Sequence, residues 1–212
     1  MLEHKFYINL DKDTDRAIKF KDTDFVRWAA VSREEVTDEV DKKMISFHNF
    51  PRQSHLARCG CFSSHLELYI HIVENKLNNV LIVEDDFVQT APFPTEYPDD
   101  SIIYLGGVLA NQKITDSSPV KIDFKTGVNR LNPKYRMLMT MSYIIPRWEL
   151  AKEILDLIFT HKRYRAIDIF LGNISLSRPY YIYPACGEEE GVASTIHKRQ
   201  KKANNRYRLV KI

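Results

Sequence analysis

Residues 80–87 read Val80-Leu81-Ile82-Val83-Glu84-Asp85-Asp86-Phe87, so that four apolar side chains run directly into three carboxylates. A short continuous apolar run favours a strand that is buried on both faces of a sheet. Open α/β sheets bind their ligands beyond the carboxyl ends of the strands, which is where these acids would lie. Crowded carboxylates repel one another, and a hard cation such as Mg²⁺ or Mn²⁺ neutralises them and can bind the phosphates of a nucleotide. The alternative is that the acids begin a solvated loop or cap a helix.

Segments with strand and helix patterns alternate on both sides of residues 80–87. Strands are expected at residues 5–10, 26–31, 80–83, 101–105, 136–145 and 180–183. Helices are expected at residues 17–21, 63–76 and 167–174 and in the segment after Pro146. A loop with at most one short helix is expected at residues 32–53, and a loop or weak hairpin at residues 108–129. This order predicts an α/β fold, and a single domain over residues 1–212, because no repeat or linker interrupts it.

The composition excludes several classes of protein. The chain is 44% hydrophobic and 28% charged, which is typical of a soluble globular protein. Its 31 basic and 28 acidic residues give a net charge of +3, too balanced to indicate a nucleic-acid-binding protein. No apolar stretch approaches the ~20 residues that span a bilayer, and the first residues lack the apolar core of a signal peptide. A cytoplasmic location is therefore expected, unless the chain is a fragment of a longer one.

The cysteines do not predict a disulfide framework. There are three of them, Cys59, Cys61 and Cys186, and an odd number is not typical of a secreted disulfide scaffold. A zinc site made of His55, Cys59, Cys61 and His65 is disfavoured, because Cys-x-Cys lacks the usual spacer of structural zinc sites. The cysteines are expected to be small and mostly buried hydrophobic residues.

Six short motifs follow one another between about residues 5 and 196. They are Tyr7-Ile8-Asn9-Leu10-Asp11 with Asp15-Arg16, Gly60-Cys61-Phe62-Ser63-Ser64-His65-Leu66, Asn79-Val80-Leu81-Ile82-Val83-Glu84-Asp85-Asp86, Thr140-Met141-Ser142-Tyr143-Ile144-Ile145, Asp168-Ile169-Phe170-Leu171 and Tyr181-Ile182-Tyr183-Pro184. Together and in this order they resemble glycosyltransferase family 25, which includes bacterial lipooligosaccharide galactosyltransferases and procollagen galactosyltransferases. Each motif alone is weak, whereas six in order are specific.

The resemblance implies a GT-A fold, which is Rossmann-like with a mixed central sheet flanked by helices. Its nucleotide-binding part would cover about residues 1–107 and its acceptor-binding part about residues 108–197. It also implies a nucleotide-sugar donor, usually UDP-linked, a divalent cation (Mn²⁺ or Mg²⁺), and transfer of the sugar to a hydroxyl of a glycan, glycolipid or glycoprotein. Inversion at the anomeric carbon is favoured by the resemblance alone.

The acids at residues 84–86 receive roles from this resemblance. Asp86 is the first choice as a metal ligand, and Glu84 and Asp85 would complete the site or bind the ribose hydroxyls of the donor. A hydrogen bond to backbone in the turn is the alternative for Asp85. His197 is a candidate for a further metal ligand, since some GT-A enzymes use a C-terminal histidine and neutral imidazole suits Mn²⁺.

Asp168 is the candidate general base, because an acceptor hydroxyl must lose a proton when the anomeric centre inverts. It is a lone acid at the start of an apolar helical segment, so the alternative is a helix N-cap. A second acidic cluster, residues 188–190, would bind the acceptor or form a solvated loop.

Four further residues are candidates for binding the nucleotide. Asn9 and Arg16 would lie near the base, ribose or diphosphate, although Arg16 could instead pair with Asp11 or Asp13 on the surface. Ser64 and His65 begin the expected helix, whose N-terminus would bind an anion. The alternative for His65 is a core-facing ring held by one hydrogen bond.

Two other classes of protein remain open from the residues alone. One is a metal-dependent nuclease or phosphotransferase, in which the basic tail of residues 198–212 would bind nucleic acid. The other is a non-catalytic sugar-nucleotide-binding module. The tail could also be a flexible end, attract the donor's diphosphate, or hold the chain at the periphery of an anionic membrane.

Overall fold

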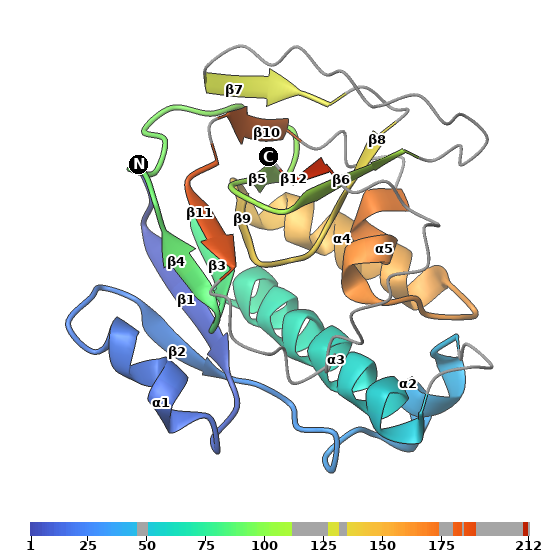
Figure 1. Ribbon diagram of the computed structural model, residues 1–212. Coiled ribbons are helices and arrows are strands. Elements are labelled where there is room, and N and C mark those ends of the chain that lie inside the picture. Colours follow the sequence, from blue (N-terminus) through green and yellow to red (C-terminus); the bar gives the residue numbers. More distant parts are fainter. Residues whose placement is uncertain are drawn as a thin grey trace.

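The computed structural model describes residues 1–45, 51–111, 127–131, 135–173, 180–183, 185–189 and 210–211. A seven-stranded mixed sheet forms the centre of the molecule (Figure 1). Its strands, in spatial order, are β2 (Val26–Ala29), β1 (His4–Asn9), β3 (Val80–Glu84), β9 (Ser142–Ile145), β5 (Ile103–Tyr104), β10 (Tyr180–Tyr183) and β7 (Gly127–Arg130).

Strand directions bring particular chain ends to one edge of this sheet. Strands β2, β1 and β3 are parallel to one another, so their carboxyl ends lie together. Strand β9 runs antiparallel between β3 and β5, and Val83 pairs with Ser142 at its beginning. The start of β9 therefore lies beside the end of β3, where the chain reaches Glu84.

Strand β3 is buried on both faces, as the apolar run predicts. Val80 and Ile82 belong to one hydrophobic cluster, and Leu81 and Val83 belong to another. The first cluster packs under α3 (Arg52–Glu74), α4 (Trp148–Thr160) and α5 (Ile167–Asn173), which lie together on one side of the sheet (Figure 1). The second cluster packs on the opposite side, around Phe20. The predicted α/β class, with a mixed central sheet flanked by helices as in a GT-A-like domain, is confirmed.

The remaining elements are short. Helix α1 (Thr14–Ala17) continues into a 3₁₀ turn (Ile18–Phe20), and α2 (Asp38–Lys43) is a short helix of the kind allowed for residues 32–53. Thr37 caps α2, since its side chain accepts a hydrogen bond from the Val40 amide. Two small sheets lie beside the main one, formed by β11 (Gly187–Glu189) with β4 (Phe87–Gln89), and by β12 (Val210–Lys211), β6 (Val108–Asn111) and β8 (Tyr135–Leu138).

Two predicted elements are wrong. Helix α3 begins at Arg52 rather than at residue 63, because its first half is rich in small and polar residues and lacks the apolar stripe that marks the second half. The single strand expected over residues 136–145 is two strands in two sheets, β8 and β9. The chain turns between them at Met139, whose φ of 72° lies in the left-handed region that a non-glycine residue seldom adopts.

Candidate active site

The carboxyl edge of the sheet gathers polar residues from three strands. Asn9 ends β1, Glu84 ends β3 and Thr140 lies just before β9. The Glu84 amide donates a hydrogen bond to the Met141 carbonyl over 2.9 Å, which fixes the turn of β3 against the start of β9. This is the edge at which open α/β sheets bind ligands.

Asp85 is held by two side chains from the first motif. Its Oδ1 accepts from Arg16 Nη1 at 2.7 Å, and its Oδ2 accepts from Asn9 Nδ2 at 2.9 Å. The Asp85 side chain is only 12% exposed and that of Arg16 only 14%, so this ion pair is well shielded from water. Burial lowers the pKa of Arg16, but the bond to Asp85 and the charges of Asp85, Asp86 and Asp13 outweigh it and raise the pKa above its ordinary value. The alternative of a backbone hydrogen bond for Asp85 is not what the structure shows.

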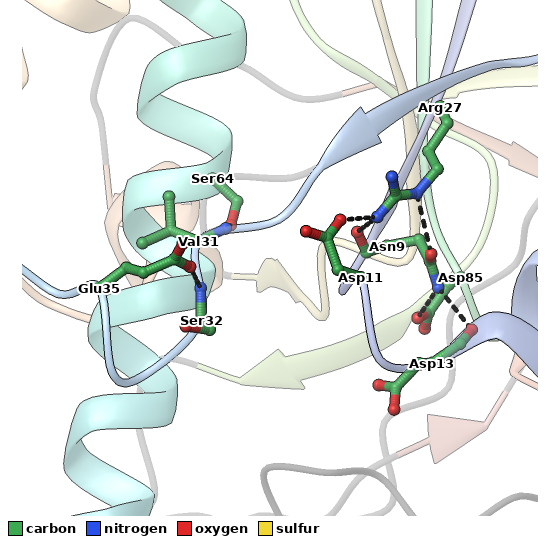
Figure 2. A network of polar contacts seen from close by, with 9 residues as sticks. All are labelled: Asn9, Asp11, Asp13, Arg27, Val31, Ser32, Glu35, Ser64 and Asp85. Carbon is green, nitrogen blue, oxygen red and sulfur yellow. Dashed lines mark hydrogen bonds and ion pairs between the residues drawn. The ribbon is translucent and has the colours of Figure 1, made fainter.

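Asn9 is fully engaged in organising this corner (Figure 2). Its Nδ2 also donates to the Asp13 carbonyl at 3.0 Å, and its Oδ1 accepts from Arg27 Nε at 3.1 Å. Arg27 in turn bonds to the Asn9 carbonyl at 3.1 Å and to the Asp11 carboxylate. We did not predict a role for Arg27, although it is the one charged residue within the apolar segment 26–31.

Glu84 lies on the other side of the edge, between α3 and β9. Its Oε1 accepts from Thr140 Oγ1 at 2.6 Å and lies 3.7 Å from His65 Nε2. Burial would raise the pKa of Glu84, but the contacts with His65 and Thr140 and the charge of Arg16 outweigh it, so the pKa lies below its ordinary value. Glu84 is therefore an ionised carboxylate at neutral pH.

Asp86 follows Asp85 and is also buried, with 8% of its surface exposed. Its negative charge acts on both Arg16 and the Cys61 thiol, so Asp86 lies near the residues around Asp85 and also near the residues around Glu84. His197 and the tail at residues 198–209 lie outside the described residues. The backbone of Glu188 and Glu189 forms strand β11 against β4 rather than the loop that was the alternative to acceptor binding.

Ser64 and His65 do not begin a helix, so the expected anion site at a helix N-terminus is wrong. Both lie in the middle of α3, because this helix begins at Arg52. Ser64 is fully buried, donates to the Gly60 carbonyl at 2.8 Å and accepts from the Val31 amide at 2.9 Å. It joins α3 to the chain leaving β2 (Figure 2). Gly60 permits this approach, since a Cβ there would lie 2.5 Å from the Val31 carbonyl oxygen.

His65 is a buried ring held at one nitrogen, as the alternative prediction describes. It is 1% exposed, and its Nδ1 lies 2.7 Å from the Tyr143 hydroxyl. Tyr143 also lies 2.7 Å from the hydroxyl of Tyr69, which is on the same helix as His65. The ring therefore has a fixed orientation, with its other nitrogen toward Glu84.

Asp168 is partly buried in the first turn of α5. This helix starts at Ile167, so Asp168 is inside it and is not its N-cap. Its two oxygens accept from the Met139 amide at 3.3 Å and the Ile169 amide at 2.7 Å. Burial raises the pKa of Asp168, and the charge of Glu84 adds to the rise, while these hydrogen bonds and the charge of Arg58 oppose it without cancelling it. Asp168 and Glu84 are thus near neighbours.

A comparison with protein families identifies the family of the chain. The sequence model of Glycosyltransferase family 25 (LPS biosynthesis protein) matches residues 2–171, which is most of the 212-residue chain. The matched segment includes every strand and helix that builds the edge described above. The chain belongs to glycosyltransferase family 25, and it is a glycosyltransferase. A search of curated proteins found no match. A glycosyltransferase requires a sugar donor and an acceptor.

No helix in the described part of the chain has the length and apolar character needed to cross a membrane.

Proposed function

We propose that the protein transfers a hexose from a UDP-linked donor to a hydroxyl of a glycan, glycolipid or glycoprotein, with inversion and with the help of a divalent cation. The observation that supports this most is the cluster of Glu84, Asp85 and Asp86 at the carboxyl edge of the sheet, beside the buried Arg16. The description of the family as an LPS biosynthesis protein favours a lipopolysaccharide glycan among these acceptors.

The residues at the edge fit a hard cation. Mn²⁺ and Mg²⁺ prefer carboxylate oxygens, which Glu84 and Asp86 offer. Asp85 is less suited to be a ligand, because Arg16 and Asn9 already occupy one lone pair on each of its oxygens. We therefore assign the cation to Asp86 and Glu84, with His197 as a further candidate. When bound, the cation would stabilise the negative charge that develops on the leaving diphosphate.

Arg16 and Asn9 would act on the nucleotide side of the site. Arg16 is a shielded cation whose position is fixed by Asp85, so it is suited to attract the donor's diphosphate. Asn9 uses its side chain within the protein, and its contribution to donor binding would be to hold Asp85 and Arg27 in place.

Asp168 would accept the proton of the acceptor hydroxyl. A general base works best when its pKa lies near the working pH, and burial moves the pKa of Asp168 in that direction. The hydrogen bonds from the Met139 and Ile169 amides orient the carboxylate, and each oxygen keeps a second lone pair for the substrate.

A nucleotide-sugar panel tests this proposal. Purified protein with Mn²⁺ is incubated with UDP-, GDP- and CMP-linked sugars, and release of the nucleotide is measured with and without EDTA. We expect release from a UDP-hexose that stops when EDTA is added. Release from GDP- or CMP-sugars instead, or release that EDTA does not change, would contradict the donor or the cation respectively.

A further inference from the structure

Three side chains with metal-binding atoms meet behind the carboxylate edge. They are Cys61 and His65 on α3 and Glu84 at the end of β3, and one ligand atom from each lies within 4.8 Å of the others. Cys61 and His65 are four residues apart, so they share one face of the helix. His65 Nε2 and Glu84 Oε1 are 3.7 Å apart, close to the separation of about 3.4 Å expected for two ligands of a tetrahedral zinc ion.

The orientation of His65 points to a missing partner. Its Nε2 is buried and makes no hydrogen bond to any residue in the described part of the chain. The opposite nitrogen, Nδ1, contacts the Tyr143 hydroxyl, and Tyr143 is supported by Tyr69. Histidines that bind metals are held in this way, by a hydrogen bond at the nitrogen that does not bind. In the tautomer in which Nδ1 donates to the Tyr143 hydroxyl, the lone pair of Nε2 is directed toward Glu84 and is available to a cation.

The electrostatic surroundings of Cys61 favour a cation as well. The carboxylates of Glu84, Asp168 and Asp86 all lie close enough to the Cys61 sulfur to act on it electrostatically. Thr140 holds Glu84 Oε1, the oxygen that lies 3.7 Å from His65 Nε2, and this oxygen keeps a second lone pair for a cation.

We propose that Cys61, His65 and Glu84 form a binding site for a borderline-soft divalent cation of the zinc or cobalt class. A thiolate and an imidazole select such ions over Mg²⁺, which prefers oxygen ligands alone. Binding releases the thiol proton of Cys61 to solvent, because a thiolate is the form that binds metal. The site shares Glu84 with the proposed donor site but does not depend on a nucleotide sugar.

A second cluster, formed by two residues of α3 and one residue of α2, provides an internal control. Asp41, His55 and Cys59 also lie within 4.8 Å of one another. However, both oxygens of Asp41 contact the guanidinium of Arg52, and His55 Nε2 already bonds to Asp41 at 2.9 Å. Because these ligand atoms are occupied, Cys59 is not expected to bind a metal.

Titration of the metal-free full chain with Co²⁺ tests the site. Thiolate-bound Co²⁺ absorbs strongly in the near ultraviolet, so we expect a charge-transfer band that saturates at one equivalent. The Cys61→Ser variant should lose the band, the Cys59→Ser variant should keep it, and His65→Gln should weaken Co²⁺ binding by at least tenfold. No band in the native protein, a band that survives Cys61→Ser, or a band lost with Cys59→Ser would overturn the proposal.

A second measurement uses only the native protein, so that its result does not depend on whether a variant folds. The native protein is alkylated with and without Zn²⁺, and modified cysteines are mapped by peptide mass spectrometry. The rates of modification at the buried Cys59 and Cys186 serve as references for the rate at Cys61. We expect Zn²⁺ to slow its modification, and an unchanged rate would contradict the site. Neither readout uses a nucleotide sugar, so failure of the donor assay leaves this test intact.

Discussion

Asp85 and Asp168 are both shielded carboxylates, but their surroundings differ in the groups that contact them. Asp85 bonds to Arg16 and to Asn9, which is itself bonded to Arg27, so its charge is matched by a network from β1, β2 and the helix between them. Asp168 accepts two backbone amides, and its pKa is raised by burial and by the charge of Glu84. The first region matches the charge of Asp85 with hydrogen-bonded partners, whereas the second makes ionisation of Asp168 less favourable.

The difference separates residues that build the site from residues suited to chemistry. The Asp85 carboxylate is poorly placed to act as a base, because both of its oxygens already accept hydrogen bonds from side chains of the protein. A carboxylate with a raised pKa, close to a strained residue such as Met139, is typical of a reactive position. We therefore expect substitutions in the Asp85 region to change stability first, and substitutions in the Asp168 region to change activity first.

The largest expected effect is that of Asp168→Asn on transfer. Removal of a general base typically lowers turnover by about 10²–10⁴-fold, and donor binding should remain. The free energy of unfolding should stay within about 1 kcal/mol of the native value. The variant loses one hydrogen bond, but it also loses a carboxylate whose pKa is raised on folding and whose ionisation therefore opposes folding at pH 7. Initial rates of sugar transfer and urea unfolding at pH 7 measure both. Normal turnover would remove Asp168 as the base.

The next effect is that of Asp85→Ala on stability. This substitution leaves Arg16 shielded without its partner carboxylate, which should lower the free energy of unfolding by about 3 kcal/mol in urea denaturation. The matched control is Glu34→Ala, which removes the exposed Arg33–Glu34 pair and should lower the free energy of unfolding far less than Asp85→Ala does. Equal losses in the two variants would contradict the view that Asp85 is a structural anchor.

Gly60→Ala tests the contact between α3 and the chain that leaves β2. The added Cβ would lie 2.5 Å from the Val31 carbonyl oxygen, so α3 must move away from the end of β2. We expect a loss of about 2 kcal/mol in thermal or urea unfolding, within the range for overpacked sites. An unchanged melting temperature would show that α3 is not fixed at this point.

The smallest effect concerns the hydrogen bond from Thr140 to Glu84. Thr140→Val removes it and should cost about 1.5 kcal/mol at pH 7. The pKa of Glu84 is lowered on folding, so its contribution to stability is present above its unfolded value of 4.5 and is lost as the pH falls through the folded value. The difference between variant and native protein should therefore shrink at pH 4. A difference that grows at pH 4 would contradict a lowered pKa for Glu84 in the folded protein.

How far the sequence could predict this molecule depended on how local each signal was. The buried strand at residues 80–83 was predictable, because its apolar run and the acids after it are contiguous. The first half of α3 was not, because its face against the core carries His55, Cys59 and Gly60 rather than a stripe of large apolar residues. The break at Met139 depends on two separate sheets, which no local pattern in residues 136–145 indicates.

The candidate site shows the same limit. Its acids could be named from one segment and from the ordered motifs. The Asn9–Asp85 bond joins residues 76 positions apart, and nothing in either residue type predicts that the two will pair. Arg27 was missed for this reason, and the contact of His65 with Tyr143 spans 78 positions. Pairing at this range follows from strand order, which the structure supplies.

The central claim is that the acids at residues 84–86 hold a cation for a sugar nucleotide, with Asp86 as the main ligand. The most direct test is thermal unfolding with UDP, with and without Mn²⁺, in the native protein, in Asp86→Ala and in the control Asp22→Ala, which removes an exposed acid. We predict that UDP raises the melting temperature of the native and Asp22→Ala proteins far more when Mn²⁺ is present, and that Asp86→Ala loses this Mn²⁺-dependent part. An Mn²⁺-dependent shift that is fully retained in Asp86→Ala would contradict the claim.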